Sequence, residues 1–593
     1  MDVFFGWGLE LDSGEWPSVA INANQEMVMA YIPSAYIPSD HQLAYRQGTL
    51  QHATVAWTIE ETYGEGCEPS IAISRTTAME VHRGADDDDD RLFYGLGSLT
   101  DGRILWLASD KYDKGLTPSV AINDGGFVFE VHRSENTGRL WYNVGLIDDA
   151  SIHWKKKDDF ADGDNPSVSM NNAGQAIVAY DRDNVVYYRL ATTNGNDIEF
   201  QAEHGVADSA SQPSVAVTDD GVFILCFTQS DSLWQRIGTI DGTTVSWGDA
   251  VTFDEGAQVS VAAQNGLAVQ VHSWPQAGNM LYFSTSIITD RSRWMSDRVS
   301  ELGNLPLRDL VLPGSHSGGM YLTQTSDSSK TQDMSVYGQL IYGLRWFDLR
   351  VTFIYTKLVH DLVIYQDEPS PEFGPKLTDV LDDIRKFMER GGRELIILKF
   401  SHFESIGTDE WNLMVKEIDD RVGSWLYRGP LPAGKRLADL TLNEYGGAVL
   451  LVVDGDWAMN DPRPGYWVYR DATAENPAEG DLRVYDEYSR TNDYNEMSTD
   501  QINKFFSYNG TCTDAVYSAC DLFLLSWTLT TTSVESIESL ALTPNQHLAD
   551  EVGKLPVKND WGKIINIVCV DYVEYARPSD VAIASKNDGG AHG

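Results

Sequence analysis

The chain has 593 residues, of which 42% are hydrophobic and 11% aromatic, so it is too long for one hydrophobic core and too apolar for global disorder. Its 88 acidic and 44 basic residues give a formal charge of -44, which repels phosphate backbones and makes nucleic acid an unexpected partner. No apolar run approaches the roughly 18 residues of a membrane span, and the N-terminal stretch lacks the features of a secretion signal. We expect two globular domains and no transmembrane segment.

One phrase recurs six times in the first half of the chain, at successive spacings of 52, 49, 48, 47 and 46 residues. The copies read GEWPSVAIN, GCEPSIAIS, GLTPSVAIN, GDNPSVSMN, ASQPSVAVT and GAQVSVAAQ. Alternating runs that follow each copy predict about four short strands per unit, which is typical of a propeller blade. We therefore predict a six-bladed β-propeller over residues 1–288. Its N-terminal strand, near Trp7, would complete the last blade and so remove exposed sheet edges.

Two features of the repeats could suggest chemistry. The VHRG stretch contains His82, but His132 and His272 occupy equivalent points of other repeats, which indicates a structural role. The acidic run from Asp86 to Asp90 favours a solvated loop, with calcium binding left as an alternative. Propellers host both enzymes and binding modules, and a glycan or a protein is the ligand that we expect for this one.

The second half alternates short apolar runs with amphipathic segments, which predicts a (β/α)8 TIM-type barrel over residues 289–593. Helices are predicted at LTDVLDDIRKFMERGG, ending at Gly391-Gly392, and at STDQINKFF, opened by a Ser498/Gln501 capping box. The predicted strands are LRDLVLPG, GLRWFDLRV, KLVHDL, ELIILKF, AVLLVVD, LRVYDEYS, DLFLLSWTLT and IINIVCVDY.

Barrel enzymes carry their chemistry at the C-terminal ends of the strands, and this rule selects a group of polar residues. Cleavage of a phosphodiester by an internal hydroxyl needs a base, an acid and a cation for the charge that develops on phosphorus. Histidine suits the first two tasks and arginine the third. The predicted strands deliver His316, Asp348, Arg350, His360, Asp486, Tyr488 and Asp571 to one mouth.

Several stretches of the second half resemble the phosphatidylinositol-specific phospholipase C X-domain family, especially its bacterial and X-domain-only members. They include LRDLVLPGSH, GQLIYGLRWFDLRV, KLVHDL and VYDEYSR. The resemblance implies that His316 is the base toward the inositol 2-hydroxyl, His360 the acid toward the diacylglycerol oxygen, and Arg350 the cation at the phosphate. It further implies that Asp571 orients His316 and that Asp486 and Tyr488 hold the inositol ring.

The same resemblance bears on metals and on departures from the pattern. Calcium-dependent relatives have acidic residues at the positions of Arg350 and Ser401, so we expect metal-independent chemistry without a cofactor. Relatives usually place aspartate or asparagine where this chain has Ser317, and Asp348 is expected to hold Arg350 instead. Ser317, Lys399 and Ser401 are predicted to line the substrate pocket, and a scaffold role stays open for Lys399 and His402.

These observations predict an enzyme that cleaves phosphatidylinositol, or a related phosphodiester such as a glycosylated inositol anchor, through a cyclic inositol phosphate. The alternative is a binding protein whose propeller recognises a glycan or a protein and whose barrel is weakly active or inactive. The close pair Cys512 and Cys520 and the sequon at Asn509 favour an extracellular location, whereas the missing signal leaves the cytoplasm open.

Overall fold

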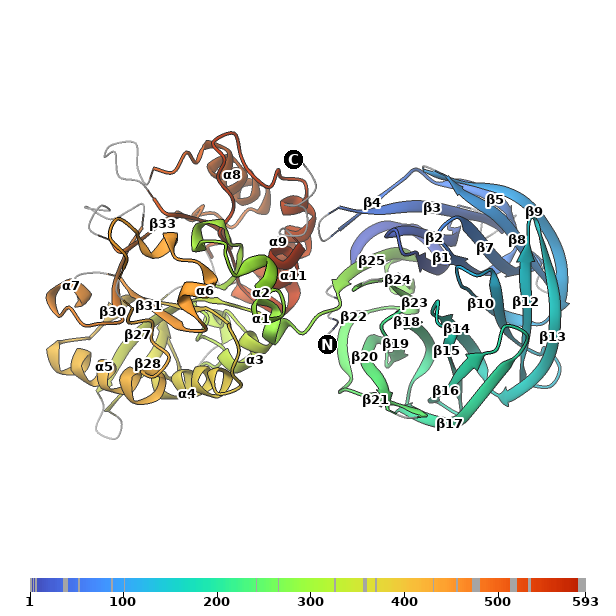
Figure 1. Cartoon of the computed structure of the whole chain (residues 1–593), viewed down its shortest axis with the longest axis horizontal. Coiled ribbons are helices and arrows are strands. Elements are labelled where there is room, and N and C mark those ends of the chain that lie inside the picture. Colours follow the sequence, from blue (N-terminus) through green and yellow to red (C-terminus); the bar gives the residue numbers. More distant parts are fainter. Residues whose placement is uncertain are drawn as a thin grey trace. The chain divides into compact units, whose positions relative to one another are not determined.

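A computed structural model of the chain divides it into two compact units, Met1–Thr289 and Asp290–Gly593, and each is described by itself (Figure 1). In the described part of the chain, no helix has the length and apolar character needed to span a bilayer. Cys512, the predicted partner of Cys520, lies outside the described residues. The structure describes residues 3, 5, 8–35, 41–51, 54–86, 89–100, 102–241, 243–264, 266–324, 327–355, 360–367, 371–429, 431–454, 457–471, 480–511, 520–531 and 535–584.

The first unit is built from antiparallel sheets arranged as a propeller-like ring (Figure 1). Four sheets are separate: β6–β9 (Cys67–Ile73, Thr77–Arg83, Arg91–Thr100, Arg103–Lys114), β10–β13 (Leu116–Ile122, Phe127–Arg133, Arg139–Asp148, Ser151–Asp162), β14–β17 (Asp164–Met170, Gln175–Arg182, Val185–Thr193, Ile198–Asp208) and β18–β22 (Ser211–Val217, Val222–Gln229, Ser232–Asp241, Thr244–Trp247, Val251–Glu255). An eight-stranded sheet joins β1–β5 (Leu9–Ile21, Glu26–Pro33, Gln42–Gln51, Thr54–Trp57, Glu61–Glu65) to β23–β25 (Ala257–Gln264, Leu267–Trp274, Met280–Ile287).

The prediction of six separate blades is therefore wrong, because the described strands form four separate sheets and one merged eight-stranded sheet. The cause is the length of β1, which has 13 residues and pairs with two strands in succession. Its first part, Leu9–Ser13, pairs with β25, and its second part, Gly14–Ile21, pairs with β2. One continuous strand thus merges the sheet of β23–β25 with the sheet of β2–β5.

The repeated phrase explains how neighbouring inner strands are held together. In each copy the serine after the proline, or after Val259 in the last copy, accepts a hydrogen bond from a backbone N–H of the next inner strand. Ser18 Oγ accepts from Ile71 N at 3.0 Å, and Ser260 Oγ accepts from Val19 N at 3.0 Å, which closes the ring. The other four bonds join Ser70 to Val120, Ser119 to Val168, Ser167 to Val215 and Ser214 to Val261.

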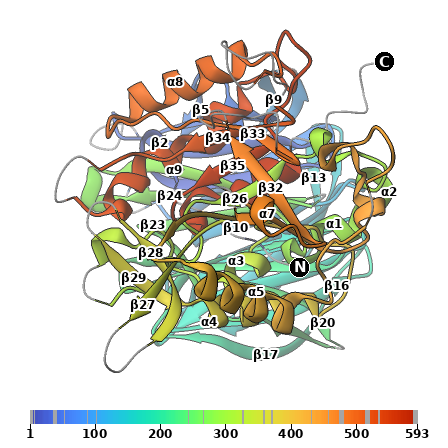
Figure 2. The same ribbon diagram turned by 90° about the vertical axis from the view of Figure 1, so that its left-hand side faces the viewer.

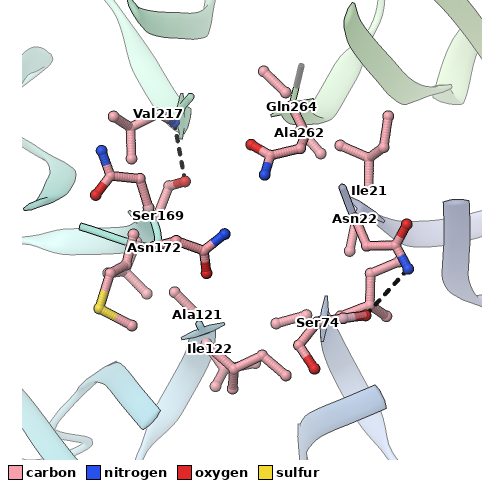
Figure 3. A pocket seen from close by; sticks show the side chains of 18 of the residues that line it. Ile21, Asn22, Ser74, Ala121, Ile122, Ser169, Asn172, Val217, Ala262 and Gln264 are labelled. Atoms are coloured by element: carbon pink, nitrogen blue, oxygen red, sulfur yellow. Dashed lines mark hydrogen bonds between the residues drawn. The ribbon is translucent and has the colours of Figure 1, made fainter. Parts of the chain in front are cut away.

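Polar side chains at one end of the inner strands also form hydrogen bonds between neighbouring strands. They line a cavity of about 110 Å³ (Figure 3). Asn22 Nδ2 donates to Ser74 O at 3.1 Å, and Gln264 Nε2 donates to Asp219 Oδ2 at 2.8 Å. In these hydrogen bonds the side chains of Asn22 and Gln264 connect neighbouring inner strands. A glycan or protein ligand of the propeller remains a prediction.

The histidines of the VHRG-like stretches lie at equivalent places on β7, β11 and β24. Each is buried, and each Nδ1 contacts the side chain two residues earlier: Glu80 for His82, Glu130 for His132 and Gln270 for His272. In the acidic run, Asp87 and Asp88 lie outside the described residues, while Asp89 pairs with Arg91.

The second unit contains a closed barrel of eight parallel strands (Figure 2). The strands pair in the order β26, β27, β30, β31, β32, β33, β34 and β35, and β35 pairs with β26 to close it. Their bounds are Leu312–Ser315, Trp346–Tyr355, Ile396–Glu404, Val449–Val453, Tyr466–Asp471, Leu482–Asp486, Leu522–Trp527 and Ile567–Val570. The helices are α1 (Trp294–Asp297), α2 (Val299–Leu302), α3 (Val336–Ile341), α4 (Leu377–Met388), α5 (Thr408–Val422), α6 (Leu442–Tyr445), α7 (Trp457–Asn460), α8 (Tyr494–Ser507), α9 (Ile537–Gly553), α10 (Val573–Ala576) and α11 (Pro578–Ala584).

Two of the predicted barrel strands need correction. The KLVHDL stretch is no barrel strand: β28 (His360–Gln366) runs antiparallel to β27 and pairs on its other side with β29 (Glu372–Lys376). It was misassigned because an apolar run does not reveal whether the chain crosses over or turns straight back. The fifth strand, β32, was missed because YWVYRD mixes aromatic and charged residues and contains no apolar run.

Helix α4 forms as its pattern predicts, whereas the start of α8 differs. In α4 the residues Leu377, Val380, Leu381 and Ile384 are buried at helical spacing, which directs one face to the core. Helix α8 begins at Tyr494 with Asp493 as its N-cap, so Ser498 and Gln501 lie inside the helix and form no capping box. Buried Gln501 Oε1 instead accepts from Ser526 N of β34.

A buried ion pair supports the opposite end of the barrel from the strand C-termini. Arg345 precedes β27 and Glu394 precedes β30, and Arg345 Nε donates to Glu394 Oε2 at 2.8 Å. Both residues are almost fully buried, and Glu394 Oε1 also accepts from Ser296 N and Ser296 Oγ. The pair therefore ties the first helical turns to two barrel strands.

Glu394→Ala is expected to lower the free energy of unfolding of the barrel by about 3–5 kcal/mol, because it leaves a buried guanidinium without its counter-charge. Asp297→Ala is the matched control, since Asp297 forms a half-exposed pair with Arg293 and its loss is expected to cost less than about 1 kcal/mol. Urea unfolding of the full chain measures both. Equal effects of the two substitutions would contradict the account.

Candidate active site

His316 follows the first barrel strand and is fixed by the last one. Its backbone N–H donates to Val570 O at 3.0 Å, and its Nδ1 lies 2.8 Å from Asp571 Oδ1. About a quarter of the His316 side chain is exposed, whereas Asp571 is buried. The carboxylate therefore selects the tautomer with the proton on Nδ1 and leaves Nε2 available at the mouth.

Arg350 lies next to this imidazole, on β27. Its Nη2 is 3.4 Å from His316 Nε2, and its Nη1 is 3.4 Å from Asp367 Oδ1. Asp348, two residues earlier on the same strand, places Oδ2 at 3.7 Å from Arg350 Nε. One guanidinium thus lies between the imidazole and two carboxylates.

Asp348 is buried and forms the centre of the polar cluster. Ser401 Oγ donates to its Oδ1 at 3.0 Å, and Lys399 Nζ lies 3.4 Å from the same oxygen. Burial opposes ionisation, but the charges of Lys399 and Arg350 outweigh it and hold the pKa of Asp348 well below its usual range. Asp348 is therefore a carboxylate at neutral pH.

Lys399 bridges two carboxylates below the mouth. Its Nζ is 3.0 Å from Asp486 Oδ2, which also accepts from Tyr469 Oη at 2.9 Å. Burial lowers the pKa of Lys399, but the negative charges of Asp348 and Asp486 raise it by more. The pKa of Lys399 therefore lies above its usual range. Both predicted pocket residues, Lys399 and Asp486, thus have internal partners.

Lys399→Met is expected to lower the free energy of unfolding by about 3–5 kcal/mol at pH 7, because two carboxylates lose a buried cation. In the wild type, the contribution of Asp348 is present above the unfolded carboxyl pKa and is lost as pH falls through its lower folded value. The contribution of Lys399 is present below the unfolded lysine pKa and is lost as pH rises through its higher folded value. The alkaline loss should be absent in the variant.

Unfolding curves recorded at several pH values test this expectation. Lys416→Met is the control, because Lys416 pairs with Asp420 on the exposed face of α5. A Lys399→Met deficit as small as that of the control would show that the bridge contributes nothing.

The hydroxyl groups of Ser317 and Ser401 donate hydrogen bonds to neighbouring side chains. Ser317 has a φ of 41° and is buried, and its Oγ donates to Gln366 Oε1 at 3.0 Å. Ser401 is likewise buried, with its hydroxyl bonded to Asp348. Both hydroxyls hold other groups in position.

His360 lies apart from this cluster, whereas Tyr488 follows Asp486 by two residues. His360 pairs with Tyr355 near the end of the β27–β28 hairpin, five residues and hence about 17 Å along the strand from Arg350. The two rings stack at 4.2 Å, and both side chains are exposed. Tyr488 is exposed beside Arg490. Among the described residues, no hydrogen bond or ion pair links His360 or Tyr488 to His316 or Arg350.

The structure therefore brings together seven of the predicted residues: His316, Asp348, Arg350, Lys399, Ser401, Asp486 and Asp571. The sequence indicates no site role for Gln366 and leaves a scaffold role open for His402. His402 could have been found by the strand-end rule, because it follows the apolar run IILKF. Within the described ranges, no group of three or more His, Cys, Asp or Glu side chains is arranged to hold a metal ion.

The sequence of the chain is similar in part to several known proteins. No protein-family model matches the chain. A PI-PLC X-box domain-containing protein of Dictyostelium discoideum is 28% identical over 183 residues, covering 28% of this chain and 24% of that protein. Human PI-PLC X domain-containing protein 2 is 28% identical over 166 residues, covering 22% of this chain and 50% of that protein.

Part of the chain is similar to proteins of the PI-PLC X-domain family. The resemblance predicted from the motifs is thereby confirmed. A further relative, the 1-phosphatidylinositol phosphodiesterase of Listeria monocytogenes, is 27% identical over 166 residues, covering 27% of this chain and 48% of that protein. The chain thus spans between about a quarter and a half of the length of these curated PI-PLC relatives.

Two solved bacterial structures are similar to part of this chain. The phosphatidylinositol-specific phospholipase C of Listeria monocytogenes has a TM-score of 0.38 at 18% identity, covering 50% of this chain and 99% of that one. The corresponding enzyme of Staphylococcus aureus has a TM-score of 0.37 at 17% identity, covering 50% and 97%.

Proposed function

We propose that the barrel is a phosphodiesterase that cleaves phosphatidylinositol, or a related phosphodiester, through a cyclic inositol phosphate. The contact chain Asp571–His316–Arg350, with distances of 2.8 Å and 3.4 Å, carries this proposal. It places a polarised imidazole and a guanidinium side by side at the C-terminal mouth of the barrel, where barrel enzymes bind substrate. The family relationship supports the same reaction class.

The first step is an attack by the substrate's own hydroxyl. His316 Nε2 takes the proton from the inositol 2-hydroxyl, whose oxygen forms a bond to phosphorus. The bond from phosphorus to the diacylglycerol oxygen breaks, and that oxygen receives a proton from a second group. Asp571 stabilises the imidazolium that forms at His316 and keeps the ring oriented.

Arg350 supplies the positive charge at phosphorus. Its planar fork matches two phosphoryl oxygens, and the negative charge on those oxygens grows as the five-coordinate state forms. Asp348 holds the guanidinium from the other side, so the arginine is oriented before substrate binds. Because a guanidinium cannot ligate calcium and supplies the charge itself, the reaction is proposed to need no metal.

The inositol ring is proposed to bind near Asp486 and Tyr488. Asp486 Oδ2 already has two partners, Lys399 and Tyr469, which leaves Oδ1 as the oxygen for an inositol hydroxyl. Tyr488, two residues after Asp486, is exposed and is proposed to stack on the ring. Ser317, Lys399 and Ser401 position these groups in the proposal.

Incubation of the purified full chain with phosphatidylinositol vesicles and a chelator tests the function. Diacylglycerol and a water-soluble inositol phosphate are expected, and calcium should give no increase. Loss of turnover in chelator that calcium restores would contradict the metal-independent scheme. Absence of turnover by folded protein on this lipid and on a glycosylated inositol anchor would favour the alternative, a propeller that binds a glycan or a protein.

A further inference from the structure

The proposed reaction requires a second proton-transfer group, and the predicted one is badly placed. His360 lies near the hairpin end, about 17 Å along β27 from Arg350, with its ring stacked on Tyr355. The leaving oxygen must lie next to the phosphate that Arg350 binds, because both are attached to the same phosphorus. A donor therefore has to reach the surroundings of Arg350.

His402 is brought to that place by an irregularity in β30. Arg350 pairs with Ser401, but Thr352 pairs with Glu404, so β30 has one more residue than β27 between these pairs. This is a β-bulge, and His402 within it has a φ of 51°. Bulges redirect side chains, and here the strand alternation that would turn His402 away from the neighbours of Ser401 is broken.

The bulge is held in place from both sides. Tyr365 Oη on β28 donates to the backbone carbonyl of His402. His402 Nδ1 lies 3.0 Å from Ser401 Oγ, and Ser401 Oγ lies 3.0 Å from Asp348 Oδ1. The side chain of His402 is exposed, so its ring is accessible to a ligand.

The direction of these hydrogen bonds defines the reactive ring atom. Asp348 is ionised and can only accept, so the single hydroxyl hydrogen of Ser401 points to Asp348. The oxygen of Ser401 then accepts from Nδ1–H of His402. Nε2 is left for the substrate, which is the same division of roles that Asp571 imposes on His316.

We propose that His402, held through Ser401 and Asp348, is the group that protonates the leaving oxygen. This inference rests on the proposed function. Its proton travels from Nε2 of the His402 imidazolium to the oxygen released from phosphorus, while His316 holds the proton taken from the attacking hydroxyl. The two imidazoles then exchange roles when water opens the cyclic product.

The charges around His402 fit this task. Burial and the positive charges of Arg350 and Lys399 lower the pKa of His402, while Asp348 and Asp454 raise it. A bound phosphodiester brings a negative charge to Arg350 and so offsets one of the lowering influences. The net effect in the free protein is a His402 pKa below its ordinary value, and substrate binding shifts it upward, so protonated His402 is more populated with substrate bound than without.

A comparison of two leaving groups tests the proposal. Phosphatidylinositol releases an alkoxide that needs a proton, whereas the 4-nitrophenyl ester of inositol 1-phosphate releases a phenolate that does not. His402→Asn keeps a residue that tolerates positive φ but removes proton transfer. We expect it to lower kcat on phosphatidylinositol by about 10²–10⁴-fold and on the nitrophenyl ester by less than about tenfold.

Four further variants complete the experiment. His316→Ala should lower kcat on both substrates, because the attacking hydroxyl is the same. His360→Ala removes the acid that the family resemblance implies, and Asp367→Asn removes the carboxyl group that lies 3.4 Å from Arg350 Nη1 and is a second alternative donor. His153→Ala on exposed β13 is the unrelated histidine control. Melting temperatures of all variants identify any that fail to fold.

The outcomes separate the inference from the function. Equal losses on both substrates, or no loss, for folded His402→Asn would overturn the role of His402. A loss confined to phosphatidylinositol for His360→Ala or Asp367→Asn would assign the proton to that residue instead. A wild-type protein that turns over neither substrate would overturn the proposed function, and this inference with it.

Discussion

Replacement of His316 by alanine is expected to lower kcat on phosphatidylinositol by about 10³–10⁴-fold with little change in KM. The variant loses the base that accepts the proton from the attacking hydroxyl. Asp571 and Arg350 stay in place, so binding of the phosphate is retained. Steady-state release of diacylglycerol from vesicles measures the effect.

The control for this prediction is an equivalent substitution elsewhere. His153→Ala removes an exposed histidine of the propeller and should leave kcat unchanged. Asp571→Asn keeps the shape of the contact to His316 but favours the tautomer with the proton on Nε2, so a loss of about 10³–10⁴-fold, comparable to that of His316→Ala, is expected. Retention of wild-type kcat by His316→Ala would remove the base from the scheme.

Arg350→Ala is expected to lower kcat by about 10²–10³-fold or more, because the five-coordinate phosphate loses its preorganised cation. Asp348 keeps Lys399 and Ser401 as partners in this variant, so the barrel should fold. Arg350→Lys retains the charge without the planar fork and should recover only part of the loss. Steady-state kinetics on phosphatidylinositol compare the three proteins.

Chemical rescue sharpens this test. Added guanidinium ion should restore part of the kcat of Arg350→Ala at low concentrations that do not unfold the protein, and should not help His316→Ala. Kinetics of Arg350→Lys equal to the wild type would show that charge alone suffices. Failure of Arg350→Ala to lower kcat would contradict a role at phosphorus.

The repeats of the first half could be predicted from the sequence because each copy has a serine at the same position of the phrase. The serine of each phrase bonds to the next inner strand, so the sequence period of 46–52 residues equals the structural one. The sequence did not predict that β25, β1 and β2 belong to one continuous sheet. It depends on one strand changing partners at Gly14, which no local pattern encodes.

In the barrel, local patterns found most strands but not their directions. His360 was assigned to the mouth because KLVHDL reads as a strand, and its antiparallel return beside β27 is a tertiary feature. The strand-end rule selects His402 as a candidate, but its orientation toward Arg350 depends on the bulge and on its positive φ, which the sequence does not reveal. Residues that directly follow regular strands, such as His316 and Asp571, were predictable.

The most direct measurement of the central claim is a phosphorus NMR time course of phosphatidylinositol cleavage by the wild-type chain. The account predicts that the signal of a five-membered cyclic inositol phosphate appears first and that an acyclic inositol phosphate follows more slowly. The signal should be absent with His316→Ala. An acyclic phosphate that forms from the start, with no cyclic species and with activity retained in His316→Ala, would contradict the account.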